Sequence, residues 1–292
     1  MENVVEFGDA KYPRLLKEIK SPPKKLYYKG DWDSDIFENC LAVVGSRRMT
    51  TYGKQITNKL VSEIARSGIT IVSGFMFGID ATAHRAALGA GGRTIAVMPC
   101  GIDVIHPAYQ ESLYKEILEN RGLIISEFES NFPPARWTYP KRNKIVAGIS
   151  KATMVVEAGE KSGSLITASL AMEYKRRLFA VPGPLTSVVS KGTLQLIKEG
   201  AEIVIGAEDV LAGYDVVSLN SSGSPSLFLK LGKLEQFIVR RLQEEPLGID
   251  ALARLVKISA SQIGTILSLM QLKGLVVEEG GKYHIKLVEV RP

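Results

Sequence analysis

Short apolar runs recur along the first two thirds of the chain and alternate with longer amphipathic stretches. The runs begin at Leu41, Thr70, Thr94, Leu123, Met154, Leu178 and Glu202, and most of them end at a glycine, serine or proline. Between them lie segments such as 54–68 and 78–92, whose apolar residues recur every three or four positions and which close on glycine. This alternation predicts an α/β fold with an extended Rossmann-like, doubly wound and mostly parallel sheet, covered by helices on both faces. Ligands of such a sheet bind outside the carboxyl ends of its strands.

The alternation stops near Ala212, and the rest of the chain has a different pattern. Helices are expected over residues 233–245, 248–257 and 259–274, and two strands joined at Gly280-Gly281 follow them. Three helices and a hairpin describe a small winged helix-turn-helix. Its third helix carries a single basic residue, Lys273, near its end, so protein contact or dimerisation and the reading of duplex DNA all stay open.

The sequence therefore predicts four parts. Residues 1–40 are rich in proline and aspartate with little periodicity, and they are expected to form an extended arm laid on the main domain. Residues 41–212 would form the Rossmann-like domain, 213–226 a linker containing serine and glycine, and 227–292 the winged-helix domain.

Composition and charge narrow the classes of function. The net charge is +6 and the pI is near 9.1, which favours a polyanionic partner only mildly. Cys40 and Cys100 are too few for a disulfide scaffold or a structural zinc site, so no metal or cofactor is predicted. The first residues lack the basic start and apolar core of a signal peptide, and no run reaches the roughly 18 apolar residues of a membrane span. A cytoplasmic protein without membrane contact is expected.

The densest candidate chemistry lies between Tyr139 and Ala168. An aromatic ring and several cations come together at Tyr139, Lys141, Arg142, Asn143 and Lys144. After an apolar run, Ser162-Gly163-Ser164 opens a helical segment, which leaves backbone N–H groups and the positive end of a helix dipole near the strand tip. An anion is expected there. The neighbouring ring and cations favour a nucleic acid, whose bases can stack and whose phosphates can pair.

Three other segments offer polar side chains near this site. Gly45, Ser46, Arg47 and Arg48 follow the first strand, and Gly74 follows the second. The dinucleotide fingerprint G-x-G-x-x-G is absent from this first loop, and its arginines could equally form surface ion pairs. Three cations, Lys175, Arg176 and Arg177, end the helix that begins at 162–164. They could add positive charge to the site or only compensate the helix dipole.

The remaining polar residues have structural interpretations, with one alternative left open. Asp80 is expected in the first turn of a helix, His84 packed on that helix, and Cys100 buried as a thiol. Glu157 could be a hydrogen-bond acceptor that fixes its loop. It could instead act with Glu160 as the acid or base of a nucleotide hydrolase whose substrate is a nucleoside monophosphate.

Several long motifs, in order, resemble the DprA (also called Smf) family of DNA-processing proteins. They are YPRLLKEIKSPPKKLYYKGD, VVGSRRMTTYG, IVSGFMFGIDATAH, TIAVMPCGID, SEFESNFPPARWTYPKRNKIVAGIS, VVEAGEKSGSLITA and FAVPGPLTSVVSKGT, spread over roughly Tyr12 to Leu211. The resemblance implies a Rossmann-like domain that binds single-stranded DNA, forms a homodimer and helps load a RecA-type recombinase during natural transformation. The winged helix resembles the family's C-terminal module. A scaffold that acts through the winged helix is a third alternative.

The resemblance also implies roles for single residues. Arg47 would contact a phosphate, and Tyr139 takes the aromatic position of the motif F-P-x-R-N-R, in which Lys144 replaces an arginine. The sequence departs from the family at Gln110 and Leu194, each in place of an asparagine, and at the bulky pair 75–76. The expected DNA-binding residues are Gly45, Ser46, Arg47, Arg48, Gly74, Tyr139, Lys141, Arg142, Asn143, Lys144, Ser162, Gly163, Ser164, Lys175 and Lys191.

Overall fold

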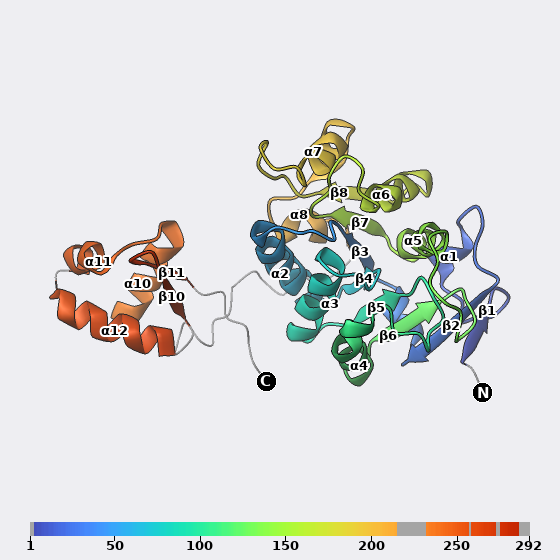
Figure 1. The fold of residues 1–292 in the computed structure, drawn as a ribbon, viewed down its shortest axis with the longest axis horizontal. Helices are drawn as coiled ribbons and strands as arrows, with labels where there is room; N and C mark the ends of the chain where they lie inside the picture. The colour runs from blue at the N-terminus through green and yellow to red at the C-terminus, as the bar shows by residue number, and fades with distance from the viewer. Residues whose placement is uncertain (1–2, 215–231, 257, 273–274, 286–292) are drawn as a thin grey trace. The chain divides into compact units, whose positions relative to one another are not determined.

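The chain divides into two units, residues 1–219 and 220–292 (Figure 1). The structure is a computed structural model that describes residues 3–214, 232–256, 258–272 and 275–285. Most of the predicted linker, 213–226, lies outside the described residues, as do Lys257, Lys273 and Gly274. Tyr214, which the prediction placed in the linker, is instead buried in the larger unit. Its hydroxyl donates to the carbonyl of Cys40 at 2.9 Å, so this unit extends further than the sequence pattern indicated.

A nine-stranded sheet forms the centre of the larger unit. Its strands are β1 (Val4–Glu6), β2 (Lys25–Gly30), β3 (Cys40–Val44), β4 (Thr70–Ser73), β5 (Thr94–Val97), β6 (Leu123–Ser126), β7 (Ala152–Val155), β8 (Arg177–Ala180) and β9 (Glu202–Ile203). They lie in the order β1-β2-β6-β5-β4-β3-β7-β8-β9. From β3 the chain steps outward through β4, β5 and β6, and then returns to the other side of β3 for β7, β8 and β9. The strand order thus reverses between β3 and β7, where the two strands pair in parallel.

Helices cover both faces of this sheet. One face carries α1 (Arg14–Lys17), α5 (Thr138–Gly148), α6 (Ser164–Glu173) and α7 (Lys191–Lys198), and the other carries α2 (Thr51–Arg66), α3 (Ile79–Gly89), α4 (Glu111–Glu119) and α8 (Ala207–Leu211) (Figure 1). Short 3-10 turns, Ser34–Phe37 and Ala108–Gln110, lie in two connections. Successive side chains of β3 lie on opposite faces of the sheet, with Ala42 and Val44 in one core and Leu41 and Val43 in the other. The prediction of a doubly wound, mostly parallel sheet is confirmed.

The N-terminal segment contributes to the sheet. The strand β2 pairs antiparallel with β6, and β1 pairs antiparallel with β2, so the expected extended arm instead supplies two strands. Along β2 only Leu26 is fully buried, whereas its neighbours are partly or fully exposed. Because this burial does not alternate, the segment has no period-two pattern that sequence analysis could find.

The smaller unit contains α10 (Lys233–Glu244), α11 (Ile249–Val256), α12 (Ala260–Leu272), β10 (Val276–Glu279) and β11 (Lys282–Ile285). The helices pack around Ile238, Leu252 and Leu267, all fully buried. Gly280 and Gly281 turn the hairpin with φ of 60° and 76°, the left-handed region that a two-residue hairpin turn requires. The three helices and the hairpin form the predicted winged helix.

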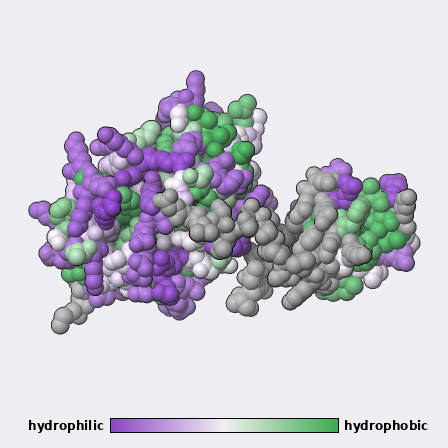
Figure 2. All heavy atoms as spheres, turned by 180° about the vertical axis from the view of Figure 1, so that it is seen from behind, coloured by the Kyte–Doolittle hydropathy of each residue, from purple (hydrophilic) through white to green (hydrophobic). Residues whose placement is uncertain are grey.

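Hydrophilic side chains cover most of the face of the larger unit in Figure 2, with a hydrophobic patch near its upper edge. Among the described residues, no single helix is long and apolar enough to cross a membrane. The pair α11 and α12 meets the length and composition requirement only together, with a bend of 111° between them.

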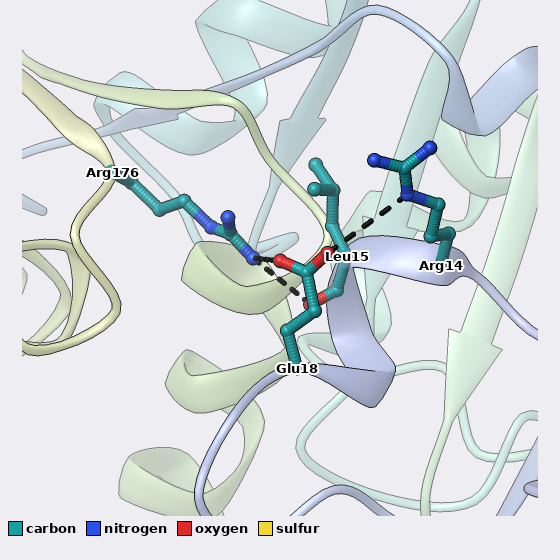
Figure 3. Close-up of polar contacts among 4 residues, drawn as sticks. All are labelled: Arg14, Leu15, Glu18 and Arg176. Carbon is teal, nitrogen blue, oxygen red and sulfur yellow. Dashed lines mark hydrogen bonds and ion pairs between the residues drawn. The ribbon is translucent and has the colours of Figure 1, made fainter.

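A partly buried arginine ties the N-terminal segment to the body of the larger unit (Figure 3). Arg176, just after α6, donates from Nη2 to the carbonyl of Leu15 at 3.0 Å and to the carboxylate of Glu18 at 3.0 Å. Its side chain is 13% exposed, whereas Arg14, which reaches the same carboxylate at 3.9 Å, is 92% exposed. The interaction joins segments far apart in the sequence and holds α1 in place.

We expect Arg176→Ala to lower the free energy of unfolding by about 1.5–3 kcal/mol, because it removes charge-assisted hydrogen bonds from a largely buried site. Arg14→Ala is the matched control. It changes the same residue type beside the same carboxylate but in solvent, so its effect should stay within about 0.5 kcal/mol. Urea unfolding followed by circular dichroism measures both, and equal effects of the two changes would contradict the anchoring role of Arg176.

Candidate nucleic-acid interface

A pocket of about 970 Å³ opens at the carboxyl ends of β3, β4 and β7, where the strand order reverses. Its wall comes from the β3–α2 loop, the β4–α3 loop, α5 with Arg136 two residues before it, and the segment that leads from β7 into α6. Val188 and Val189 of the β8–α7 connection complete it. A doubly wound sheet binds its ligands at this place, because the loops on either side of the reversal diverge and leave a crevice.

The floor of the pocket is a buried cation, Arg142 on α5. Its Nη1 donates to the carbonyls of Gly74, after β4, and Val97, at the end of β5, the latter at 2.9 Å. Its Nε donates to the Oδ1 atom of Asn143 at 3.0 Å. Only 4% of the residue is exposed. One guanidinium thus connects α5 to the ends of two strands, and its charge is balanced by oriented carbonyl dipoles.

The surroundings of Arg142 leave no room for another side chain at position 74. A Cβ at Gly74 would collide with the guanidinium, so only glycine allows this approach. Asp80, in the first turn of α3 as predicted, is also buried and accepts from the N–H of Met76 at 3.3 Å. Burial raises the pKa of Asp80, and the charge of Arg142 opposes this shift. Burial likewise lowers the pKa of Arg142, and Asp80 opposes that shift in turn.

The β3–α2 loop presents Arg47 to the pocket on a fixed backbone. The N–H of Ser46 donates to the carbonyl of Glu157 at 2.7 Å, and the carbonyl of Ser46 accepts from Ile79 at 3.2 Å. Gly78 packs against this loop with φ of 81°, where a Cβ would meet the backbone of Ser46 and Arg47. The exposed Arg47 side chain therefore starts from a rigid position.

The side chain of Arg47 lies on the ring of Tyr139. The Cζ atom is 5.1 Å from the ring centroid of Tyr139 and 5.9 Å from that of Phe77. On the same tyrosine, the hydroxyl lies 2.9 Å from Nε2 of His106. The two residues that the sequence assigned to phosphate contact and base stacking are thus in contact with each other, and the cation covers one face of the ring.

The amino end of α6 forms the opposite wall. The hydroxyls of Ser162 and Ser164 lie 2.7 Å apart, and the N-cap residue Gly163 has no side chain to cap the helix. All three residues line the pocket. The positive end of the helix dipole therefore faces the cavity, which favours an anion there.

The cations around the pocket form no ion pairs with the described residues, although the carboxylate of Asp80 lies close enough to interact with Arg142. They are Arg47, Arg48, Arg136, Arg142 and Lys161. Within the described ranges, none of them forms an ion pair, although arginines and lysines elsewhere in the larger unit form ten. Two carboxylates line the cavity, those of Asp80 and Glu160, and Glu160 lies 3.4 Å from Lys191. The pocket wall is strongly positive.

Most of the expected binding residues come together here. Those that line the pocket are Gly45, Ser46, Arg47, Arg48, Gly74, Tyr139, Arg142, Asn143, Ser162, Gly163 and Ser164. Four expected lysines do not line it. Lys144 pairs with Glu127 at 3.5 Å, Lys191 pairs with Glu160, Lys141 lies over Trp137, and Lys175 follows the far end of α6.

Sequence reasoning missed several lining residues, among them Arg136 and Lys161. Both are cations that directly flank recognised motifs, three residues before Tyr139 and one before Ser162, so their charge was a signal that could have found them. The apolar lining by Met76, Ile166 and Val188 had no comparable signal. Ile166 and Val188 are exposed side chains on a helix and a loop that sequence cannot place beside one another.

Glu157, the candidate acid or base, does not line the pocket and is 2% exposed. Its carboxylate accepts from the N–H of Thr50 at 2.9 Å and from the hydroxyl of Thr50 at 2.5 Å. That hydroxyl in turn accepts from the N–H of Gly53 and caps α2. This geometry gives Glu157 the loop-fixing role, because both carboxylate oxygens hold the start of α2.

The other polar candidates are structural as well. Burial raises the pKa of the Cys100 thiol to about 11, and its sulfur donates to the carbonyl of Val104 at 3.2 Å. Burial lowers the pKa of His84 to about 3, and its Nδ1 lies 2.6 Å from the hydroxyl of Thr94. In the part of the chain that the structure describes, no three His, Cys, Asp or Glu side chains gather as metal ligands.

Phe75 and Gln110, at two positions where the sequence departs from the family pattern, are hydrogen-bonded to each other. Phe75 has φ of 59°, which is strained for a residue with a side chain, and its ring is fully buried against Tyr114. Gln110 is also buried, and its Nε2 donates to the carbonyl of Phe75 at 2.8 Å. The bulky residue at 75 therefore fills the core, and Gln110 supports the backbone of the β4–α3 loop.

In the smaller unit, α12 presents an uncharged surface. Its exposed residues include Ser261, Gln262, Thr265 and Ser268, together with Leu272, which is 85% exposed. Helices that read a DNA groove usually carry basic or amide side chains for the backbone and base edges. The described part of α12 offers one such amide and no cation on this surface.

Comparison with known proteins supports this fold. Residues 3–215 match the model of the family described as DNA recombination-mediator protein A, and residues 229–282 match that of the DprA winged helix domain. A protein named Smf from Synechocystis sp. is 34% identical over 308 residues, which cover 94% of this chain and 77% of the relative.

Two solved structures have the same fold. DNA processing protein A from Streptococcus pneumoniae has a TM-score of 0.69 and 38% identity, covering 73% of this chain and 75% of that one. DNA processing protein A from Helicobacter pylori has a TM-score of 0.65 and 34% identity, covering 73% of this chain and 94% of that one. The work on the latter concerns its single-stranded DNA binding mode.

We expect Gly74→Ala to lower the free energy of unfolding by about 1–3 kcal/mol, because the added methyl group displaces the Arg142 guanidinium from its acceptors. Gly89→Ala in α3 is the control, since a Cβ there meets nothing within 4 Å. It should be neutral or slightly stabilising. Urea unfolding curves of both variants test this, and a neutral Gly74→Ala would mean that Arg142 can rearrange without cost.

Proposed function

The chain belongs to the DNA recombination-mediator protein A family, also called DprA or Smf, and on that premise we propose that it binds single-stranded DNA in the pocket at the ends of β3, β4 and β7. Binding would be largely independent of sequence and would involve no chemical turnover. The observation that carries the proposal is the set of five pocket cations, none of which forms an ion pair with a described residue.

Phosphates would run along the exposed cations. Arg47 and Arg48 lie on one wall, Arg136 at the start of α5, and Lys161 beside the amino end of α6. Each phosphate that pairs with one of them releases condensed counterions, so the affinity would fall as salt rises. The buried Arg142 contributes its field from the floor, and the N–H groups of its Nε and Nη1 atoms already have protein acceptors.

The ring of Tyr139 would provide a stacking surface for a base. Its hydroxyl is fixed by His106 and one face is covered by Arg47, so the ring is already oriented before DNA arrives. Every base has a π-face, and base–aromatic stacking is therefore tolerant of sequence. Arg47 can contact a phosphate while it stays over the ring, or it can be replaced there by a base.

Family membership supports three further parts of the proposal. The protein would act in the cytoplasm as a homodimer, would protect incoming single strands during DNA uptake, and would help load a RecA-type recombinase onto them. A dimer would lengthen the binding track and combine modest contacts by effective concentration. The winged helix would serve protein contact, because the surface of α12 in the described residues carries no cation.

We expect a labelled oligo-dT to bind far more tightly than its duplex form, since a base can leave the stack for Tyr139 only from a single strand. Fluorescence anisotropy titrations of oligo-dT, duplex and a labelled nucleoside monophosphate measure this directly. Binding of the monophosphate alone, with turnover that Glu157→Gln abolishes, would refute the proposal and support a hydrolase.

We expect Arg47→Ala to weaken oligo-dT binding and to reduce the slope of log K against log salt concentration by about 0.7, the value for one single-strand phosphate contact. Arg14→Ala is the matched control. It removes the same charge from a side chain that is 92% exposed and outside the pocket, so it should leave the slope unchanged. If both variants keep the wild-type slope, Arg47 is not on the phosphate path.

A further inference from the structure

The first turn of α5 directs side chains to two different places. Tyr139 and Arg142 face the pocket, as does Arg136 just before the helix. Trp137 and Lys141, four residues apart and therefore on one side of the helix, are not part of the pocket lining. They form a second surface that continues directly from the pocket along the chain.

Trp137 is half exposed, at 51%, but its ring is firmly supported. It makes edge contacts with Phe128 at 5.5 Å and with Phe132 at 5.7 Å, and these two rings stack on each other at 4.9 Å. A supported aromatic ring loses little conformational entropy when a ligand stacks on it. Isolated exposed apolar residues are common, but this ring is part of an organised cluster.

A cation accompanies this ring, as one accompanies Tyr139. The Nζ atom of Lys141 lies 4.9 Å from the ring centroid of Trp137 and 6.0 Å from that of Phe128. Lys141 is exposed and forms no ion pair with any residue that the structure describes. The arrangement of ring and free cation thus repeats outside the pocket what Arg47 and Tyr139 form inside it.

The charges on the far side of the cluster limit where a polyanion could run. A cleft of about 440 Å³ opens next to Phe128 and Phe132, and its lining carries two carboxylates, Glu127 and Glu129, and two lysines, Lys24 and Lys25. Glu127 is paired with Lys144 and Lys25 with Glu6, and Lys24 and Glu129 are both exposed, so this cleft has no excess of cations to attract a phosphate chain. A strand that leaves the pocket past Arg136 would therefore pass over Trp137 toward Lys141 and not enter this cleft.

We propose that Trp137 and Lys141 form a second base-stacking and phosphate-binding position, which extends the single-stranded DNA path out of the pocket along α5. This inference rests on the proposed function of the pocket. It adds that the affinity depends on oligonucleotide length, because only a strand longer than the pocket can reach Trp137.

An oligo-dT series from about 4 to about 16 nucleotides tests the proposal by anisotropy. Trp137→Leu should lower the affinity for the longest oligomers roughly 5- to 100-fold, the effect of one lost base stack, and leave the shortest unchanged. Trp137→Phe should stay near wild type, because it keeps a ring. Tyr139→Leu should weaken every length, since that ring lies in the pocket.

Phe7→Leu is the matched control. Phe7 is also an exposed ring, at 44%, with an edge contact to Tyr12 and with Lys17 over it at 5.9 Å, but it lies next to the edge strand β1. Its loss should not change the affinity at any length. The comparison separates stacking at Trp137 from a general effect of removing an exposed ring beside a lysine.

Tryptophan fluorescence gives a readout that a purely structural role would not produce. The chain has two tryptophans, and Trp32 is packed against Tyr28 and Phe37. In a Trp32→Phe variant only Trp137 emits, and long oligo-dT should quench it while the shortest oligomers do not. Lack of quenching at saturation with long oligo-dT would overturn the proposal.

The outcomes separate the two proposals. If the wild-type chain binds long oligo-dT and Trp137→Leu matches Phe7→Leu at every length, the second position does not exist and the pocket still binds DNA. If the wild-type chain binds no oligomer at all, the proposed function fails and the extension fails with it. Length-dependent loss confined to Trp137→Leu supports both.

Discussion

The larger unit is organised around a buried charge. The guanidinium of Arg142 is buried where β4, β5 and α5 meet, a position in which an unpaired cation would cost several kcal/mol. The cost is offset by the carbonyls of Gly74 and Val97, by Asn143, and by the nearby charge of Asp80. Each of these acceptors must keep its place for the others to be satisfied. The requirement fixes the loop after β4, excludes any side chain at position 74, and sets the orientation of α5.

This constraint explains why the site contains two kinds of cation. The Nε and Nη1 donors of Arg142 are bound to protein acceptors, so its side chain is held in place and contributes a fixed field from below. Arg47, Arg48 and Lys161 are exposed side chains on loops whose backbones are held, and they can adjust to a phosphate chain. A fixed buried cation combined with exposed, adjustable cations suits a flexible polyanion. The field of the buried cation attracts the polymer, and the exposed side chains can follow variation in the path of its backbone.

The sequence predicted the order and type of the strands from β3 to β9, because their apolar runs are short, β-branched and separated by amphipathic helices. Eleven of the fifteen expected binding residues line the pocket, because glycine and serine loops at strand ends mark the edge where such a sheet binds its ligands. The sequence could not predict that Arg142 is buried while Arg47 is exposed, because both belong to basic motifs and only tertiary packing separates them. The N-terminal strands were not predicted, because the burial along β2 does not alternate. The helix α5 was not predicted either, because its apolar residues do not recur on one side of the helix and Pro140 lies in its first turn.

The balance of charges also bears on the size of the ligand. Five cations line the pocket against the carboxylates of Asp80 and Glu160, and Lys191 pairs with the second of these. A nucleoside monophosphate carries a charge of about −2 at neutral pH and is small enough to contact one wall at a time. It would leave cations on the other walls unpaired. A single strand carries one charge per nucleotide, so a few successive nucleotides match the excess and can reach the β3–α2 loop, α5 and α6 together. The distribution of cations over several walls thus favours a polymer over a mononucleotide, independently of family membership.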